Sequence, residues 1–168
     1  MTTTLVLALV GLLLVLLAIA VWLHRRYVLI NVVGMSMQPA YHHGDRILVR
    51  RTQCSHVRRG QIVVFEYLVD VPDCTADDVT PPAASEGSVR DRSWLLKRAI
   101  AVPGDPVPRD RIASLQNGSD LVVPPEHLVV LGDNPVASMD SRNFGYVPAR
   151  RVLGVVVRRM ATTEGNTV

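Results

Sequence analysis

One long apolar run opens the chain, and only short apolar runs follow it. Residues 5–23 contain no charged side chain and are rich in Leu, Val and Ala. At about 1.5 Å per residue, a helix of this length spans a hydrocarbon core of roughly 30 Å. Trp22 lies where an interfacial aromatic anchor is expected, and the basic residues 24–26 mark the exit from the bilayer. The pattern predicts a membrane anchor in residues 1–26.

Two features of this segment leave alternatives open. Ala18-Ile19-Ala20 has the small-x-small form of a cleavage site, which is typical of a removable signal peptide. The length of the apolar run and the lack of a positive segment before it favour a retained anchor. Arg25 and Arg26 follow the helix while no Lys or Arg precedes it, so the positive-inside rule places the following domain in the cytoplasm.

Beyond the anchor, the chain shows alternation of period two or short runs of β-forming residues, separated by turn signals. These runs are residues 46–50, 62–67, 94–102, 127–131 and 152–158. They predict a mostly β, compact domain over residues 27–160, followed by a tail at 161–168. Residues 70–93 contain several prolines, acidic residues and small residues, and predict a long loop.

Length and charge restrict the class of protein. At 168 residues the chain suits one domain after the anchor. The net charge of +3 is small, and the arginines are scattered without interleaved aromatic residues, so nucleic acid is not expected as a partner. Cys54 and Cys74 are too few for a zinc ribbon, which leaves either a disulfide or two thiols.

A serine close to the anchor is a candidate nucleophile. Ser36 lies within Gly34-Met35-Ser36-Met37-Gln38-Pro39, about ten residues beyond the apolar run. A serine hydroxyl needs a base to remove its proton, and that base is usually histidine. The available histidines fall in turns or basic loops, where surface positions explain them: His42, His43, His56 and His127.

Lysine can serve as the base only when it is neutral, which requires a pKa well below the usual value of about 10.4. Lys97 lies in an apolar strand, where an isolated cation is unfavourable unless it loses its proton. Strand alternation places Lys97 with Leu95 on one face and Arg98 with Leu96 on the other. The alternative is an edge-strand lysine that points to water and discourages aggregation.

Four segments of the chain resemble, in the same order, the sequence boxes of bacterial type I signal peptidases. The resemblance runs from the anchor to about Arg158. Its boxes are Gly34-Met35-Ser36-Met37-Gln38-Pro39; Gly44-Asp45-Arg46-Ile47-Leu48-Val49; Lys97-Arg98 with Pro103-Gly104-Asp105; and Gly132-Asp133-Asn134 with Ser138-Met139-Asp140-Ser141-Arg142 and Gly145-Tyr146-Val147-Pro148.

The resemblance implies roles for individual residues. Ser36 corresponds to the nucleophile and Lys97 to the general base, while Ser138 supports the lysine and Asp140 with Arg142 braces the site. Gly34 stands where some members carry a serine that donates to the oxyanion, so half of the oxyanion hole has no assigned donor. Physical alternatives are a turn role for Ser138 and a surface ion pair for Asp140 and Arg142.

The implied function is removal of a signal or leader peptide from an exported preprotein, with small residues one and three positions before the cut. It requires no metal or other cofactor. The implied partners are signal-peptide-bearing preproteins and the lipid bilayer, and the implied location is a single-pass cell-membrane protein with its catalytic domain outside the cytoplasm. The short stretch 109–120 leaves no room for the large accessory β domain of some relatives, and no oligomeric state is indicated.

Three rival functions remain open on the sequence. A self-cleaving repressor domain shares the Ser-Lys pair but carries a DNA-binding domain where this chain has an anchor. A specialised maturation peptidase for one exported partner shares every motif. A non-catalytic, membrane-anchored β module would leave Ser36 and Lys97 without a chemical role.

Overall fold

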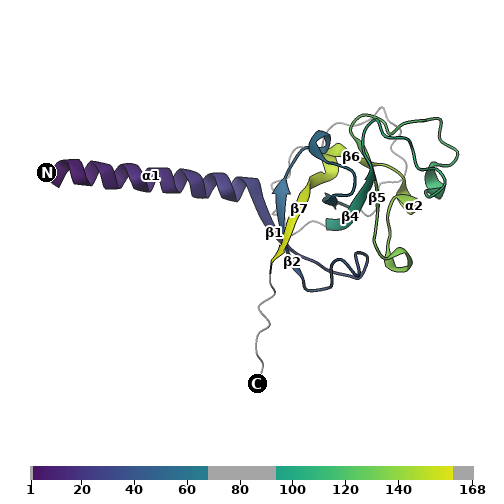
Figure 1. Cartoon of the computed structure of the whole chain (residues 1–168), viewed down its shortest axis with the longest axis horizontal. Helices are drawn as coiled ribbons and strands as arrows, with labels where there is room; N and C mark the ends of the chain where they lie inside the picture. Colours follow the sequence, from purple (N-terminus) through teal and green to yellow (C-terminus); the bar gives the residue numbers. More distant parts are fainter. Residues whose placement is uncertain (1, 68–93, 161–168) are drawn as a thin grey trace, which may run out of the picture.

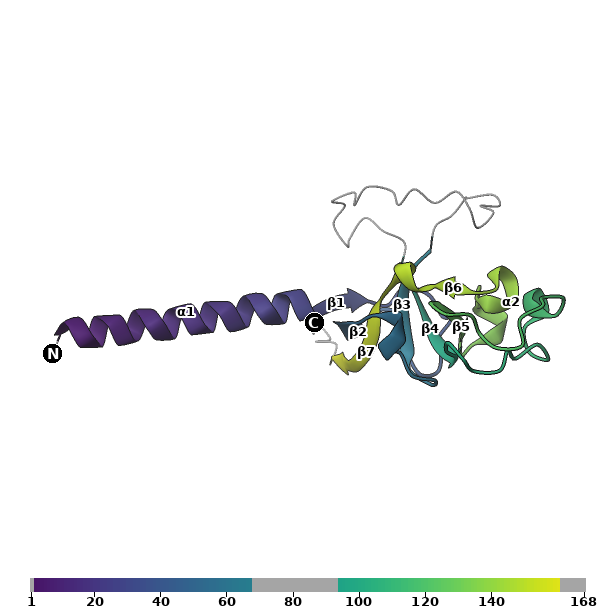
Figure 2. The same cartoon turned by 90° about the horizontal axis from the view of Figure 1, so that it is seen from above.

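The computed structural model describes residues 2–67 and 94–160. The predicted loop at 70–93, with Cys74, and the predicted tail at 161–168 lie outside the described residues. Within the described part, one helix and one curled antiparallel sheet account for the architecture, which confirms the mostly β prediction. Helix α1 extends away from the sheet as a single rod (Figures 1 and 2).

Helix α1 spans Thr2–Arg26. Leucine and valine side chains on all its sides are exposed, and none of them packs on the domain. A helix that is apolar all round is stable only where an apolar environment surrounds it. Among the described residues, α1 is the one helix with the length and composition to cross a membrane.

Seven strands form the sheet, in the spatial order β1-β2-β7-β3-β4-β5-β6. The five strands expected from the sequence are all present. Their bounds are Arg46–Arg51 for β2, Ile62–Glu66 for β3, Trp94–Ala101 for β4, His127–Leu131 for β5 and Val152–Met160 for β7.

Three elements were not predicted. Strand β1, Tyr27–Asn31, begins directly after α1 and pairs along β2. Strand β6, Val147–Pro148, and helix α2, Ser141–Phe144, are too short to show a period in the sequence. Short 3-10 turns occur at Cys54–His56, Ala113–Leu115, Pro135–Ala137 and Ala149–Arg151.

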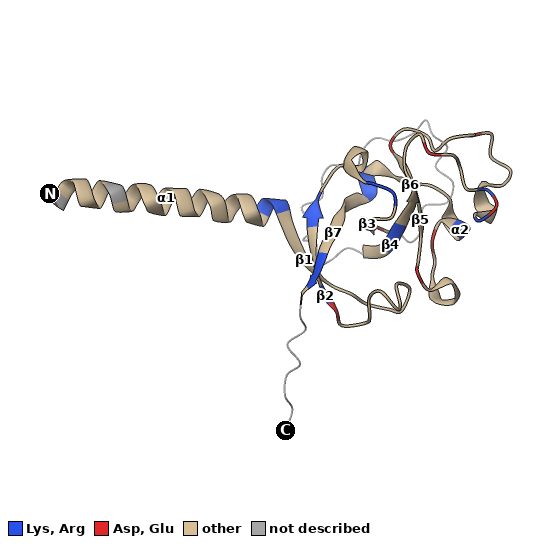
Figure 3. Cartoon of the chain, in the orientation of Figure 1, with Lys and Arg blue, Asp and Glu red and all other residues tan. Residues whose placement is uncertain are grey.

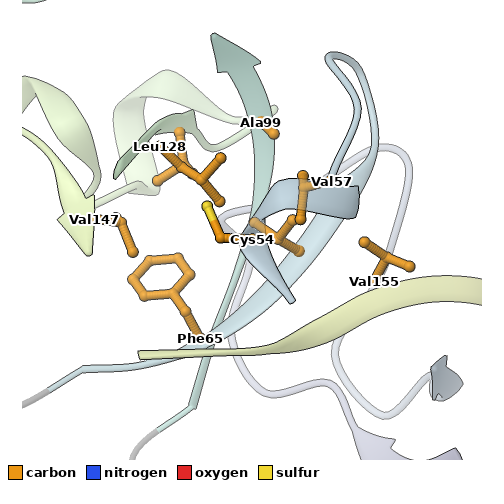
Figure 4. Close-up of a cluster of buried hydrophobic side chains, with 9 residues drawn as sticks. Cys54, Val57, Phe65, Ala99, Leu128, Val147 and Val155 are labelled. Carbon is orange, nitrogen blue, oxygen red and sulfur yellow. The ribbon is translucent and has the colours of Figure 1, made fainter. Parts of the chain in front are cut away.

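The sheet buries apolar residues on both faces. Figure 4 shows one cluster, in which Phe65 lies beside Cys54, Leu128 and Val147. A second cluster on the other face contains Ile47, Val49 and Val64, with Leu96 packed against it. Because Val63 pairs with Lys97 and Val64 pairs with Leu96, Lys97 and Leu96 lie on opposite faces of β4, as the alternation predicts.

Gly154 permits the closest approach between strands in this sheet. It lies in β7 opposite Arg51, and a Cβ at this position would lie 2.8 Å from the carbonyl carbon of Arg50 and 2.9 Å from Cα of Arg51. Real Cβ atoms do not approach backbone atoms so closely, so β2 would have to move away from β7. The absence of a side chain at Gly154 therefore fixes the position of the end of β2.

We expect Gly154→Ala to lower the free energy of unfolding by about 1–3 kcal/mol, because overpacking against rigid backbone strains the strand pair. Thermal unfolding of the detergent-solubilised chain measures the change. Gly118→Ala is the matched control, since its Cβ meets only an ordinary contact at 3.5 Å from the Leu115 carbonyl oxygen. Equal stability of the two variants would contradict the packing argument.

Candidate active site

Ser36 lies on a closed loop between β1 and β2. The ends of the loop are joined by two backbone hydrogen bonds, from Val32 N to the Asp45 carbonyl at 2.8 Å and from Gly44 N to the Val32 carbonyl at 2.9 Å. Gly34 has φ +95°, a conformation that a side chain disfavours. Met37 is only 2% exposed and anchors the loop in the core. These contacts hold Ser36, which is half-buried, on a compact turn.

The end of β5 contacts the Ser36 turn directly. Asn134 N donates to the Ser36 carbonyl at 3.0 Å, and the Asn134 side-chain amide donates to the Met35 carbonyl at 3.2 Å. A Cβ on Gly132 would lie 2.6 Å from the Ser36 carbonyl oxygen and closer still to Ser138 Oγ. Glycine at position 132 therefore lets Ser36 and Ser138 lie against the same stretch of backbone.

Lys97 is the only lysine of the chain, and its side chain is 1% exposed. The pairing of Arg98 with Leu131 places Lys97 level with Gly132, at the end of β5 that contacts the Ser36 turn. Burial lowers the pKa of Lys97 to about 8, although the negative charge of Asp140 opposes the shift, and Arg142 adds to it. Within the part of the chain that the structure describes, no hydrogen bond joins Ser36 to Lys97.

Asp140 is completely buried and binds donors from three residues. Arg142 makes a bidentate contact, from Nε to Oδ1 at 2.9 Å and from Nη2 to Oδ2 at 2.7 Å. Ser138 Oγ donates at 2.6 Å and Gly132 N at 2.9 Å. Burial alone would raise the pKa of Asp140, but these donors outweigh it and lower the pKa to about 2. Asp140 is therefore a buried carboxylate rather than part of a surface pair.

Asp133, which lies just beyond β5, forms a second ion pair. Arg98 donates from Nε to Asp133 Oδ1 at 2.8 Å and from Nη2 to Oδ2 at 2.6 Å, and its Nη1 donates to the Gly60 carbonyl at 2.9 Å. This pair ties β4 to the residue after β5. Arg98 follows Lys97 in the chain and Asp133 follows Gly132, but only the strand register shows that they meet.

Ser141 is a further residue that the sequence did not single out. Its buried hydroxyl accepts a hydrogen bond from Val130 N at 2.9 Å, and its carbonyl accepts one from Ser114 Oγ at 2.6 Å. These bonds hold the start of α2 against β5. They fix the segment that carries Ser138, Asp140 and Arg142.

Two histidines and Cys54 make contacts of other kinds. His43 Nδ1 accepts from Gly34 N at 3.3 Å, while His127 Nδ1 lies 2.8 Å from the Pro125 carbonyl. Cys54 is buried in the core. Among the described residues, no group of three or more His, Cys, Asp or Glu side chains is placed to hold a metal ion.

A groove beside Ser36 separates two strand segments. One wall is formed by the end of β1 and the Ser36 loop, and the other by the start of β4. The lining residues are Ile30, Asn31, Val32, Val33, Gly34, Ser36, Met37, Ile47, Val64, Trp94, Leu95 and Leu96. Most of the lining is therefore apolar, and Ser36 lies within it.

Known proteins resemble this chain over most of its length. The family model for signal peptidase, peptidase S26, matches residues 2–113 and 108–161. "Signal peptidase I" of Leptolyngbya laminosa is 30% identical over 142 residues, which cover 74% of this chain and 64% of that protein. "Mitochondrial inner membrane protease subunit 1" of Schizosaccharomyces pombe is 32% identical over 87 residues, or 52% of each chain.

A third relative, "Probable signal peptidase I-2" of Synechocystis sp., is 27% identical over 137 residues, which cover 71% of this chain and 56% of that protein. The chain thus spans between about half and two thirds of the length of these relatives. The two family matches together cover nearly the whole chain. It follows that the chain belongs to the signal peptidase family, peptidase S26.

Proposed function

We propose that this chain is a membrane-bound serine endopeptidase that removes signal or leader peptides from exported preproteins after small residues. The observation that carries the proposal is the burial of Lys97, which brings its pKa to about 8 next to the segment that contacts the Ser36 turn. A lysine with this pKa is neutral in about a tenth of the molecules at pH 7 and in about half at pH 8, and the neutral amine can accept a proton. Family membership supports the class of substrate.

The proposed reaction is acyl transfer through Ser36. Neutral Lys97 takes the hydroxyl proton as Ser36 Oγ attacks the carbonyl carbon of the small residue that precedes the cut. The C–N bond then breaks, and the proton passes from Lys97 to the leaving amine, which leaves an acyl-enzyme ester on Ser36. Lys97 next takes a proton from water, the hydroxide attacks the ester carbon, and the C–Oγ bond breaks as the proton returns to Ser36.

Backbone groups near Ser36 support stabilisation of the oxyanion. The Ser36 carbonyl is engaged by Asn134 N, whereas the Ser36 amide has no hydrogen-bond acceptor among the described residues. We assign this amide as one oxyanion donor. Gly34 carries no side chain that could supply a second donor, so a second donor would have to come from another residue.

Ser138, Asp140 and Arg142 act on Lys97 rather than on the substrate in this mechanism. Ser138 donates its hydroxyl proton to Asp140, so its oxygen lone pairs remain able to accept an N–H from Lys97 and orient the amine. Arg142 neutralises much of the Asp140 charge, which would otherwise favour protonated Lys97. Ser138 therefore orients the base, while Arg142 offsets the effect of Asp140 on the pKa of Lys97.

We expect Ser36→Ala and Lys97→Met each to reduce kcat/KM for cleavage of a model secretory precursor by about 10³-fold or more, because each removes a member of the catalytic pair. Cleavage by the detergent-solubilised chain is followed by gel electrophoresis and N-terminal sequencing of the product. Ser55→Ala, at an exposed serine in a 3-10 turn, is the matched control and should cut at the wild-type rate. Activity retained by either test variant, or absent from the wild type, refutes the proposal.

The pH dependence gives a second test. Below the pKa of Lys97 the amine is charged and cannot accept the proton, so log kcat/KM should rise by one per pH unit and level off above pH of about 8. Because Lys97 is the only lysine, ¹³Cε-lysine labelling gives a single side-chain signal whose titration reports its pKa directly. The midpoint of the kcat/KM profile and the midpoint of the NMR titration should coincide. An NMR midpoint near 10.4 would exclude Lys97 as the base.

The side of the membrane follows from the proposed substrates. Exported preproteins present their cleavage sites outside the cytoplasm, so we place the domain there, although Arg25 and Arg26 lie in the last turn of α1. Trypsin added to intact cells should then digest the domain, which is rich in arginine. A cytoplasmic marker protein must stay intact as the control. Protection of the domain until the cells are permeabilised would place it in the cytoplasm.

A further inference from the structure

A groove with a basic lining lies where α1 joins the sheet. It has a volume of about 570 Å³, which is within the range of roughly 300–1,000 Å³ that is usual for ligand sites. The described residues that line it include three arginines and a histidine but no acidic side chain: Arg26, Arg50, Arg51, Thr52, Gln53, His56 and Leu153. In Figure 3, the basic colour on α1 is confined to its end and returns on the tip of the neighbouring strand β2.

The sheet register fixes the groove at the level where α1 ends. Arg50 pairs with Tyr27, the residue that immediately follows Arg26 at the end of the helix. Gly154 holds β7 against Arg50 and Arg51 and prevents this end of β2 from shifting. If α1 spans a bilayer, these guanidinium groups therefore lie at the depth of the phospholipid headgroups.

The arginines of the groove differ from the arginines that have acidic partners. Arg98, Arg142 and Arg159 form ion pairs with Asp133, Asp140 and Asp45. Within residues 2–67 and 94–160, Arg26, Arg50 and Arg51 have no acidic partner.

Arg50 also carries a buried donor that has no acceptor. Its Nε is inaccessible to solvent and has no hydrogen-bond partner in the described structure. A buried N–H without an acceptor is unfavourable, so the position of Arg50 is not explained by contacts within the domain. Arg109 Nε is also buried without a hydrogen-bond partner. Arg109 does not line the groove, however, and its Nη2 donates to the Gly118 and Asp120 carbonyls.

We infer that this groove binds the phosphate of an anionic phospholipid headgroup through Arg26, Arg50 and Arg51. Guanidinium groups bind phosphate oxygens by paired, charge-assisted hydrogen bonds, and within the described residues no acidic side chain competes for these three arginines. The position beside the apolar helix favours a lipid over a soluble phosphate. Arg26 is then part of a headgroup site, which gives a basic residue after α1 a function independent of membrane orientation.

Native mass spectrometry of the full chain, released from micelles that contain equal amounts of phosphatidylglycerol and phosphatidylcholine, tests this inference. The wild type should retain phosphatidylglycerol selectively. Arg50→Gln combined with Arg51→Gln should weaken its retention by roughly 10- to 30-fold, since each basic side chain contributes about 1 kcal/mol at a lipid surface. Arg58→Gln combined with Arg59→Gln removes the same charge from an exposed turn outside the groove and should leave retention unchanged.

Thermal unfolding without anionic lipid checks that each variant folds. If the double glutamine variant has a lowered unfolding temperature, Arg50→Lys combined with Arg51→Lys replaces it. This variant keeps the charges but removes the bidentate geometry, and its retention of phosphatidylglycerol should lie between those of the wild type and the glutamine variant. Equal loss in both charge-matched glutamine variants, or equal retention of the two lipids, overturns the inference. Displacement of the lipid by inorganic phosphate would reassign the groove to a soluble phosphate. None of these readouts depends on peptidase activity.

Discussion

The burial of one amino group is the constraint on which the rest of the site depends. Lys97 is 1% exposed in the interior of a β-sheet, where an ammonium group is unfavourable. The chain uses arginine, which does not lose its proton in proteins, at every other basic position and lysine only here. The same burial that disfavours the charged form supplies the neutral amine that the proposed mechanism needs.

The amine stays neutral only if the negative charge of a nearby carboxylate, Asp140, is balanced by other groups. Asp140 lies close enough to raise the pKa of Lys97, but Arg142 and Ser138 bind its oxygens and Arg142 acts on Lys97 in the opposite sense. Gly132 donates to the same carboxylate and also lies against the Ser36 carbonyl. Three segments distant in sequence are thereby held at one point, so a displacement of any one would alter the other two.

The end of the domain next to α1 is arranged by the same sheet. Strand β1 begins where α1 ends, and the Ser36 loop begins where β1 ends, so only a few residues separate the helix from Ser36. Strand β2 runs antiparallel beside β1 and so returns to the end of the helix (Figure 1). Its register places Arg50 opposite Tyr27. A single strand pair thus sets both the distance of Ser36 from the end of α1 and the position of the basic groove.

The sequence by itself predicted the N-terminal apolar helix and the five longer strands, because helical length and period-two alternation are local properties. The segments that carry Ser36, Lys97 and Asp140 were singled out by their resemblance to the sequence boxes of a known family. The sequence could not determine that Asp133 meets Arg98, that Asn134 binds the Ser36 turn, or that Arg50 lies beside the end of α1. Each of these contacts joins residues between 23 and 98 positions apart in the chain, and only the tertiary structure brings them together. The depth at which Lys97 is buried, and hence its pKa, was likewise decided by tertiary packing, since an edge strand of the same sequence would leave the amine in water and charged.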